Sequence, residues 1–252
     1  MRRHGRYGGA VEKLLVVLLF LLSVTRFLIQ KLMRRKGTGT AADAQRGDLV
    51  IRWNGFWLAV SLLICVAFAV FGIPLGIPHV ILWILVVFVF FIPFWRCNEI
   101  LIAFLGDAFD QMGASDKAKR IIAGRAEEPL WRRVIRGSGG HTNLSSTQRI
   151  WLALRSYVEV VFNVGLIHCG LACLRPRLLL SQTDDFYRGS KISTVGDAIY
   201  FSAITITTVG YGDITPVHWS ARSFVIYEIS IGLILLYISV VVYVSNPQPQ
   251  GQ

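Results

Sequence analysis

Residues 205–213 read Thr-Ile-Thr-Thr-Val-Gly-Tyr-Gly-Asp, and this stretch decides how the rest of the chain is interpreted. Its two glycines, Gly210 and Gly212, occupy alternate positions, so the backbone can adopt dihedral angles that other residues rarely reach. Successive carbonyl groups can then point to one side, which neither a helix nor a strand allows. A Gly-rich β-turn in a surface loop is the simpler alternative, but the preceding Thr/Val-rich residues and the long apolar flanking segments argue against it.

The composition of the 252-residue chain predicts a membrane protein. Hydrophobic residues make up 54% of the chain and charged residues only 16%, whereas a soluble domain carries about 25% charged residues. The net charge of +11 would also suit a nucleic-acid-binding protein, but the basic residues cluster beside apolar segments, as cytoplasmic anchors of membrane helices do. We therefore expect the lipid bilayer, and no nucleic acid, as a partner.

Residues 1–54 form a basic N-terminal segment. Its apolar run from Leu14 to Ile29 is cut short by Arg26, and an apolar segment of about 10–14 residues is more often interfacial than membrane-spanning. We predict an in-plane amphipathic or interfacial helix there, with a short membrane helix as the alternative, followed by a polar, flexible linker over residues 37–47.

The sequence pattern of residues 55–95 predicts a transmembrane helical hairpin. Residues 56–72 and 80–95 are apolar throughout, and the turn between them, 73–78, contains two prolines and no charge. At about 1.5 Å per residue each apolar run reaches about 25 Å, which is enough for a short membrane span.

The sequence pattern of residues 96–148 predicts a cytoplasmic, mostly helical linker. Apolar side chains from Ile100 onward recur at helical spacing opposite Glu99 and two aspartates, and we interpret this stripe as a packing face. Ser145 and Gln148 have the spacing of a capping box that opens the next helix. The sequence leaves open whether this linker senses a ligand, a cytoplasmic regulatory partner or membrane tension.

Residues 149–252 contain the opening stretch and three predicted helices. Pro176 is expected to end the first helix, and Thr194 and Asp197 have the spacing of an N-cap and a first-turn acid for the second. The predicted segments are a helix over 147–174, a polar extracellular turret over 175–193, a short helix over 194–206 and a last helix over 219–244.

The run Thr207-Thr208-Val209-Gly210-Tyr211-Gly212-Asp213-Ile214-Thr215-Pro216, preceded by Tyr200-Phe201-Ser202, resembles the pore of the bacterial two-helix-pore potassium channel family. The resemblance covers residues 149–245 and implies an all-α membrane protein with an outer helix, a pore helix, a filter and an inner helix. It implies a potassium-selective channel subunit of the cell membrane, not an enzyme, with K⁺ as the permeant ion and no cofactor. Because the chain holds one filter and a pore needs four, we expect a homotetramer.

The resemblance also implies roles for individual residues. The ion-binding residues of the filter would be Thr208, Val209, Gly210, Tyr211 and Gly212, with K⁺ held by the carbonyls of the first four and by the hydroxyl of Thr208. The residues that support the filter would be Thr207, Asp213, Tyr200 and Phe201, of which the last two would pack behind Tyr211.

Gly232 stands where the family places the hinge glycine of its inner helix, and close helix packing is an equally good explanation for it. Ile204 occupies the place where some members carry a carboxylate behind the filter, which argues against an acid-pair inactivation mechanism. The pore-lining face of the inner helix is expected to hold Leu233, Leu236 and Val240.

Glu228 is an ionisable residue inside the last predicted helix, where carboxylates are costly and face a bundle interior or a water-filled cavity. Counting back from Leu174 at about 1.5 Å per residue puts Asn163 at a matching depth. We therefore expect a protonated Glu228 hydrogen-bonded to Asn163, or failing that to a hydroxyl of Ser202 or Thr205. The alternative is a solvated charge that faces the cavity and concentrates K⁺.

The orientation follows from the filter. With its Tyr211 end outside, the C-terminus is cytoplasmic, and counting backward gives four spans and a cytoplasmic N-terminus, in agreement with the positive-inside tendency. A channel-derived sensor or scaffold, whose residues 1–148 carry the role, and a potassium-uptake transporter subunit are the competing functions. The intact filter argues against the first, and the single copy of the filter argues against the second. No apolar segment has the regular arginine spacing of a voltage sensor.

Overall fold

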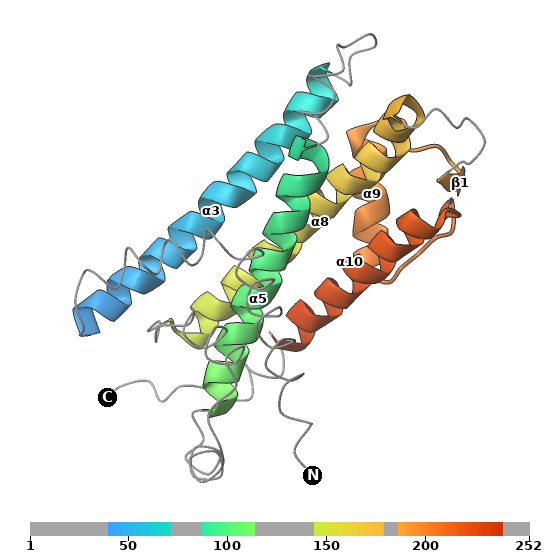
Figure 1. Cartoon of the computed structure of the whole chain (residues 1–252). Coiled ribbons are helices and arrows are strands. Elements are labelled where there is room, and N and C mark those ends of the chain that lie inside the picture. Colours follow the sequence, from blue (N-terminus) through green and yellow to red (C-terminus); the bar gives the residue numbers. More distant parts are fainter. Residues whose placement is uncertain (1–39, 72–86, 114–143, 179–185, 239–252) are drawn as a thin grey trace, which may run out of the picture. The chain divides into compact units, whose positions relative to one another are not determined.

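The computed structural model describes residues 40–71, 87–113, 144–178 and 186–238. The predicted interfacial helix and the turn at 73–78 lie outside these residues. The elements are helices α3 (Thr40–Phe71), α5 (Ile92–Gly113), α8 (Ser146–Leu178), α9 (Val195–Ile206) and α10 (Trp219–Tyr237), a π-helical turn η1 (Val87–Phe91), and strands β1 (Tyr187–Gly189) and β2 (Ile214–Pro216) (Figure 1).

The protein is an all-α membrane protein, as predicted. Within the described residues, three helical segments are long and apolar enough to cross a membrane: Gly47–Val70, Thr147–Ala172 and Trp219–Tyr237. The fourth predicted span, 80–95, lies partly outside the described residues.

The chain divides into two compact units. One comprises Met1–Ile51, Asn98–Ile150 and Tyr237–Gln252. The other comprises Arg52–Cys97 and Trp151–Leu236, and we call it the core unit. The boundaries predicted at residues 54/55, 95/96 and 148/149 all fall inside continuous helices.

Helix α3 begins at Thr40, so the prediction of a linker over 37–47 is wrong for its described part. The segment contains Ala41, Ala42 and Ala44, and alanine has the highest helix propensity of all residues. The polar composition that suggested a linker belongs to the first turns of a long helix.

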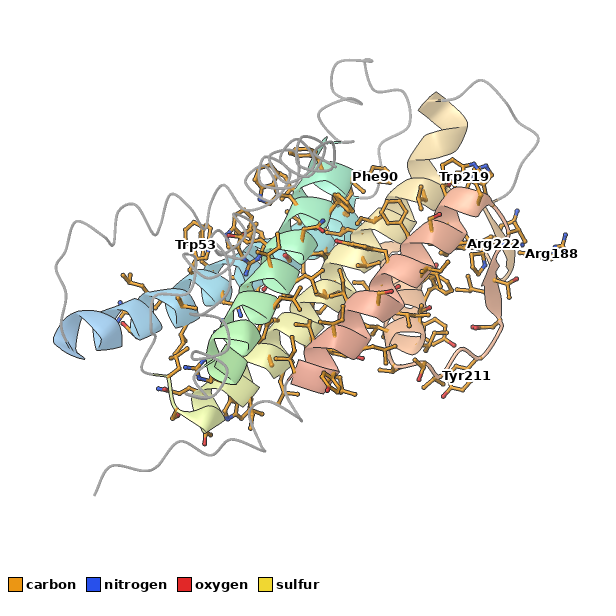
Figure 2. The ribbon with its side chains drawn as sticks, turned by 60° about the horizontal axis from the view of Figure 1, so that its bottom comes forward. Trp53, Phe90, Arg188, Tyr211, Trp219 and Arg222 are labelled. Carbon is orange, nitrogen blue, oxygen red and sulfur yellow. The ribbon has the colours of Figure 1, made fainter. Side chains whose placement is uncertain are left out.

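The second helix of the predicted hairpin is described from Val87 onward. There η1 leads directly into α5, and Pro93 lies in the first turn of α5, where its missing N–H is tolerated. A Cβ atom at Gly170 of α8 would lie 2.5 Å from Cγ1 of Val89 and 2.8 Å from Cε2 of Phe90. The glycine therefore allows α8 to pack closely against η1, beside the Phe90 ring labelled in Figure 2.

A buried polar cluster joins α3, α5 and α8 in the core unit. Arg96 of α5 donates from Nε to Oε1 of Glu159 in α8 over 2.6 Å, and from Nη2 to Oδ1 of Asn54 in α3 over 2.6 Å. Asn54 in turn donates to the hydroxyl of Ser156 over 3.0 Å. Arg96 and Glu159 are both buried, so this ion pair is a structural contact between helices distant in sequence.

The prediction that Glu99 faces away from a packing stripe is wrong. Residues 96–100 are all buried, as is Phe104. The helix is therefore surrounded on every side at this level and has no solvated face. The capping box that precedes α8 is confirmed, because the Ser145 and Gln148 side chains each accept a bond from the other residue's backbone N–H.

Helix α8 runs two residues beyond Pro176, to Leu178, so the predicted end was slightly early. The two strands that follow were not predicted. Strand β1 pairs antiparallel with β2, with Arg188 opposite Thr215 and Gly189 opposite Ile214. This small sheet joins the segment after α8 to the segment directly after residues 207–213.

Among the described residues of the core unit, an apolar cluster packs α9 and β2 against α3 and α8. Its buried members are Cys65, Leu166, Cys169, Ile192, Val195, Ala198, Phe201 and Ile214. The cluster fixes the position of α9 and of β2, which flank the loop of residues 207–213.

Candidate functional site

The site begins with α9, which is built as the sequence predicts. Thr194 is its N-cap and accepts a hydrogen bond from the N–H of Asp197, and Asp197 accepts in return from the N–H of Thr194. Asp197 also accepts from the N–H of Ser193. This reciprocal capping fixes the start of the helix, and its last residue, Ile206, leads directly into the loop of residues 207–213.

The loop has an unusual backbone conformation. Thr208, Gly210 and Gly212 have positive φ angles of 58°, 50° and 80°. The two glycines reach this region without steric cost, whereas Thr208 does not. The alternate glycine spacing therefore produces a backbone conformation found in neither a helix nor a strand.

Three successive amide groups of the loop point back toward α9. The N–H of Thr208 donates to the carbonyl of Thr205, and the N–H groups of Val209 and Gly210 both donate to the carbonyl of Ile204, at 2.9–3.0 Å. Because each peptide is planar and trans, the carbonyl preceding each of these N–H groups points the opposite way. The carbonyls of Thr207, Thr208 and Val209 therefore point away from α9 together.

These hydrogen bonds, with two others, provide donors for the last four backbone carbonyls of α9. The last four carbonyls of a helix have no partner within it. Here the carbonyl of Ala203 accepts from the N–H of Thr207, and the carbonyl of Ile206 accepts from the hydroxyl of Tyr157 in α8 over 3.0 Å. The negative end of the α9 dipole thus lies at the start of the loop, where it favours a cation.

The far end of the loop is held by the sheet. The carbonyl of Asp213 accepts from the N–H of Ser190 over 2.7 Å, and its carboxylate accepts from the hydroxyl of Tyr200 over 3.0 Å. This hydrogen bond raises the pKa of Tyr200 above its ordinary value. Gly189 has φ of +93°, and a Cβ there would lie 2.1 Å from the Asp213 carbonyl oxygen.

The side chains of the loop are open in the single chain. Val209 is 51% exposed and Tyr211 is 71% exposed, and Figure 2 shows Tyr211 at the edge of the loop. Phe201 is buried against the rings of His168 and Tyr187, at centroid distances of 5.0 and 5.6 Å. Within one chain, Phe201 therefore packs on the outer helix and β1, and its predicted packing behind Tyr211 stays a prediction.

The structure gives Gly232 a packing contact. A Cβ at this position of α10 would lie 2.5 Å from Cγ1 of Ile206, so the glycine lets the inner helix approach the end of α9. Its role as a hinge stays a prediction. Leu233 and Leu236 of the predicted pore-lining face are exposed in the single chain, while Val240 lies outside the described residues.

The prediction that Asn163 is the partner of Glu228 is wrong, and the second choice, Ser202, is confirmed. The hydroxyl of Ser202 hydrogen-bonds to Oε1 of Glu228, and His168 Nε2 lies 3.2 Å from Oε2. Asn163 instead accepts from the hydroxyl of Ser61. Glu228 is 0% exposed, so in the single chain it does not face a solvated cavity.

The error has a geometric reason. The estimate of how deep each residue lies in the membrane was counted from residue 174, but α8 ends at Leu178. Counting ten residues back from Leu178 at about 1.5 Å per residue gives about 15 Å and reaches His168. A correct helix end would have found this histidine. Gly165, whose added Cβ would lie 3.1 Å from Cα of Ile199 in α9, had no sequence signal.

Comparison with known proteins agrees with this geometry. A family model described as "Ion channel" matches residues 177–247, which include α9, the loop, the sheet and α10. No solved structure matches the chain. Among the described residues, no group of three or more His, Cys, Asp or Glu side chains is placed to hold a metal ion. Residues 177–247 therefore resemble an ion channel domain.

Proposed function

We propose that the protein is a subunit of a tetrameric potassium-selective channel that conducts K⁺ passively across the cell membrane. The observation that carries this proposal is the common direction of the carbonyls of Thr207, Thr208 and Val209, set by the bonds of the following amides to α9. In potassium channels, rings of such carbonyls from four chains replace the water shell of the ion.

The ion sites in this proposal are formed by Thr208, Val209, Gly210 and Tyr211, with Gly212 completing the loop. The positive φ angles of Gly210 and Gly212 support this assignment, because a loop that keeps its carbonyls on one side needs residues without a Cβ penalty. K⁺ is the only ligand proposed, and Thr207, Asp213, Tyr200 and Phe201 act as supports.

The tetramer is supported by apolar surface that one chain leaves open. Tyr211, Val209, Leu233, Leu236 and Tyr237 are all exposed in the single chain. Large apolar side chains left exposed on a single chain are typical of an interaction surface. A single chain also offers only one quarter of each carbonyl ring, so the proposed site needs four copies around one axis.

We also propose a multi-pass orientation with both termini in the cytoplasm. The basic residues of the N-terminal segment fit the cytoplasmic side. A cysteine introduced in place of Gly8 should react with a membrane-impermeant maleimide only after cells are permeabilised. Labelling of intact cells would contradict this orientation.

Rubidium uptake into liposomes tests the channel function. Purified protein should drive uptake that barium blocks, and the K⁺/Na⁺ permeability ratio should favour K⁺. Gly210→Ala should abolish selective uptake, because alanine is strained at φ +50°. Gly196→Ala is the matched control, since an added Cβ there meets only Thr194 Oγ1 at 3.4 Å.

The outcomes separate the two leading functions. Selective uptake by wild type and Gly196→Ala, lost in Gly210→Ala, supports the channel. A stably assembled wild-type protein with no barium-sensitive uptake would contradict the channel and favour a sensor or scaffold. Wild-type K⁺/Na⁺ selectivity in Gly210→Ala would contradict the assignment of the filter.

A further inference from the structure

Five polar groups of the core unit form a continuous buried chain of hydrogen bonds. The Tyr187 hydroxyl lies 2.7 Å from Nδ1 of His168, and Nε2 of His168 lies 3.2 Å from Oε2 of Glu228. The other carboxyl oxygen of Glu228 bonds to Oγ of Ser202, which is also 2.9 Å from the carbonyl oxygen of Val161. His168, Ser202 and Glu228 are all 0% exposed.

The hydroxyl of Ser202 limits how protons can be arranged in this chain of hydrogen bonds. Its hydroxyl has one proton but two oxygen partners, Glu228 and the carbonyl of Val161. The carbonyl can only accept. Both bonds therefore form together only when Ser202 donates to Val161 and Glu228 donates to Ser202, which requires a proton on Oε1 of Glu228.

The rest of the chain fits the same arrangement. Oε2 of the neutral acid accepts from Nε2–H of His168, which leaves Nδ1 as the acceptor for the hydroxyl of Tyr187. Each proton is then used once, and all donors point in one direction, from Tyr187 through His168, Glu228 and Ser202 to Val161. No member carries a charge, so the chain avoids the cost of burying one.

An ionised pair of Glu228 and His168 fits less well. The ionised pair would still form the contact between Glu228 and His168. The single hydroxyl proton of Ser202, however, could then bond to only one of its two acceptors, Glu228 or the carbonyl of Val161. Outside the hydrogen-bond chain, the described titratable groups that interact electrostatically with Glu228 include Cys97 of α5 and Tyr157 of α8. Both are neutral at physiological pH, so neither supplies a positive charge to an ionised Glu228.

The hydrogen-bond chain includes residues from the elements on both sides of the filter loop. Ser202 lies in α9, two residues before the carbonyl of Ile204 that receives two filter amides. Tyr187 lies in β1, whose partner strand β2 begins directly after Asp213. Glu228 of the inner helix thus links the element that leads into the loop with the element that follows it.

We propose that Glu228 is a positioning residue held as a neutral acid, and that the hydrogen-bond chain from Tyr187 to Val161 fixes the filter loop at both of its ends. The positioning role rests on the proposed potassium-channel function. The protonation state does not, and it is tested separately.

Infrared difference spectroscopy in liposomes tests the protonation state. Glu228→Gln should remove the carbonyl-stretch band of a buried carboxylic acid at neutral pH. Glu159→Gln is the matched control, because Glu159 is equally buried but paired with Arg96; its replacement should remove carboxylate bands and leave the acid band. Loss of carboxylate bands alone in Glu228→Gln would overturn the neutral assignment.

Conduction tests the positioning role. Glutamine mimics the neutral acid, because its amide NH₂ can donate to Ser202 and its carbonyl oxygen can accept from His168. Glu228→Gln should therefore retain the K⁺/Na⁺ selectivity that Glu228→Leu loses. Glu228→Leu and Ser202→Ala leave buried groups unpaired and should each raise the fraction of non-conducting channels about tenfold. Ser202→Thr keeps the hydroxyl and should behave like wild type.

The results distinguish the two proposals. Normal selectivity and flux in assembled Glu228→Leu and Ser202→Ala tetramers would overturn the positioning role while leaving the channel function intact. Absence of selective flux in the wild type would overturn the channel function. The infrared bands would still decide the protonation state of Glu228 independently.

Discussion

The hydroxyl of Tyr157 in α8 donates to the carbonyl oxygen of Ile206, the last residue of α9, over 3.0 Å. The outer helix thereby completes the hydrogen bonding at the end of the pore helix, whose other terminal carbonyls are bonded by residues 207–210. The start of the filter loop is thus held by a side chain from a different helix as well as by its own amides.

Replacing this tyrosine should weaken the filter support. Tyr157→Phe should lower the free energy of unfolding by about 1 kcal/mol, the typical value of one hydrogen bond, and should reduce K⁺/Na⁺ selectivity. Tyr227→Phe is the control, because the buried Tyr227 hydroxyl has no hydrogen-bond partner among the described residues. Equal loss of stability in both variants, measured by thermal unfolding in detergent, would contradict the role of Tyr157.

Gly189→Ala should disturb the outer end of the filter. Alanine is strained at φ +93°, and its Cβ would lie 2.1 Å from the Asp213 carbonyl oxygen, so the bond from Ser190 to that oxygen should be lost. We expect destabilisation by about 1–3 kcal/mol and a lower K⁺/Na⁺ permeability ratio. An unchanged ratio would show that the sheet does not position Asp213.

Removing one member of the buried ion pair should be far more costly than removing both. Arg96→Met removes the guanidinium that is paired with the buried carboxylate of Glu159 and should cost about 3–5 kcal/mol. The double replacement Arg96→Met with Glu159→Leu should recover most of this loss. Chemical unfolding of the four proteins in a double-mutant cycle measures the coupling, and additive effects would contradict it.

Gly232→Ala tests packing against hinge motion. The added Cβ would lie 2.5 Å from Cγ1 of Ile206, so the variant should be destabilised and should conduct less. Adding Ile206→Ala removes the obstructing atom and should restore part of the lost conduction if Gly232 is a packing residue. If the second replacement restores nothing, flexibility of the glycine is the function that was lost.

The cap of α9 predicts a pH dependence. Burial alone would raise the pKa of Asp197, but its bonds from the N–H groups of Thr194 and Ser193 outweigh burial and lower it. A carboxylate with a lowered pKa stabilises the fold above its ordinary pKa of about 3.9, and this stabilisation is lost as the pH falls through the lowered value. Asp197→Asn should therefore flatten the acid side of the curve of melting temperature against pH. Superimposable acid slopes would contradict this role.

The sequence was most informative where a local backbone geometry strongly favours a few residue types. Thr194 and Asp197 mark a helix start by reciprocal bonds within four residues, and Gly210 and Gly212 mark positive φ directly. These features are local, so they can be predicted without knowledge of the neighbouring helices.

The features that were missed depend on contacts distant in the chain. The strand β1 has three residues, too few for a periodic pattern, and its partner begins 25 residues later, at Ile214. The burial of Glu99 depends on what surrounds α5, and the meeting of His168 with Glu228 depends on where α8 ends. Small errors in a helix boundary therefore become errors in the partners assigned to buried polar groups.

The ion pair between Arg96 and Glu159 also bears on how the chain is made. The two residues are 63 positions apart, and at about 5–20 residues per second the ribosome adds Glu159 roughly 3–13 s after Arg96. During this interval the contact between the Arg96 guanidinium and Glu159 cannot form, although both groups are buried in the folded protein. The buried polar cluster of α3, α5 and α8 can therefore be completed only after α8 is synthesised.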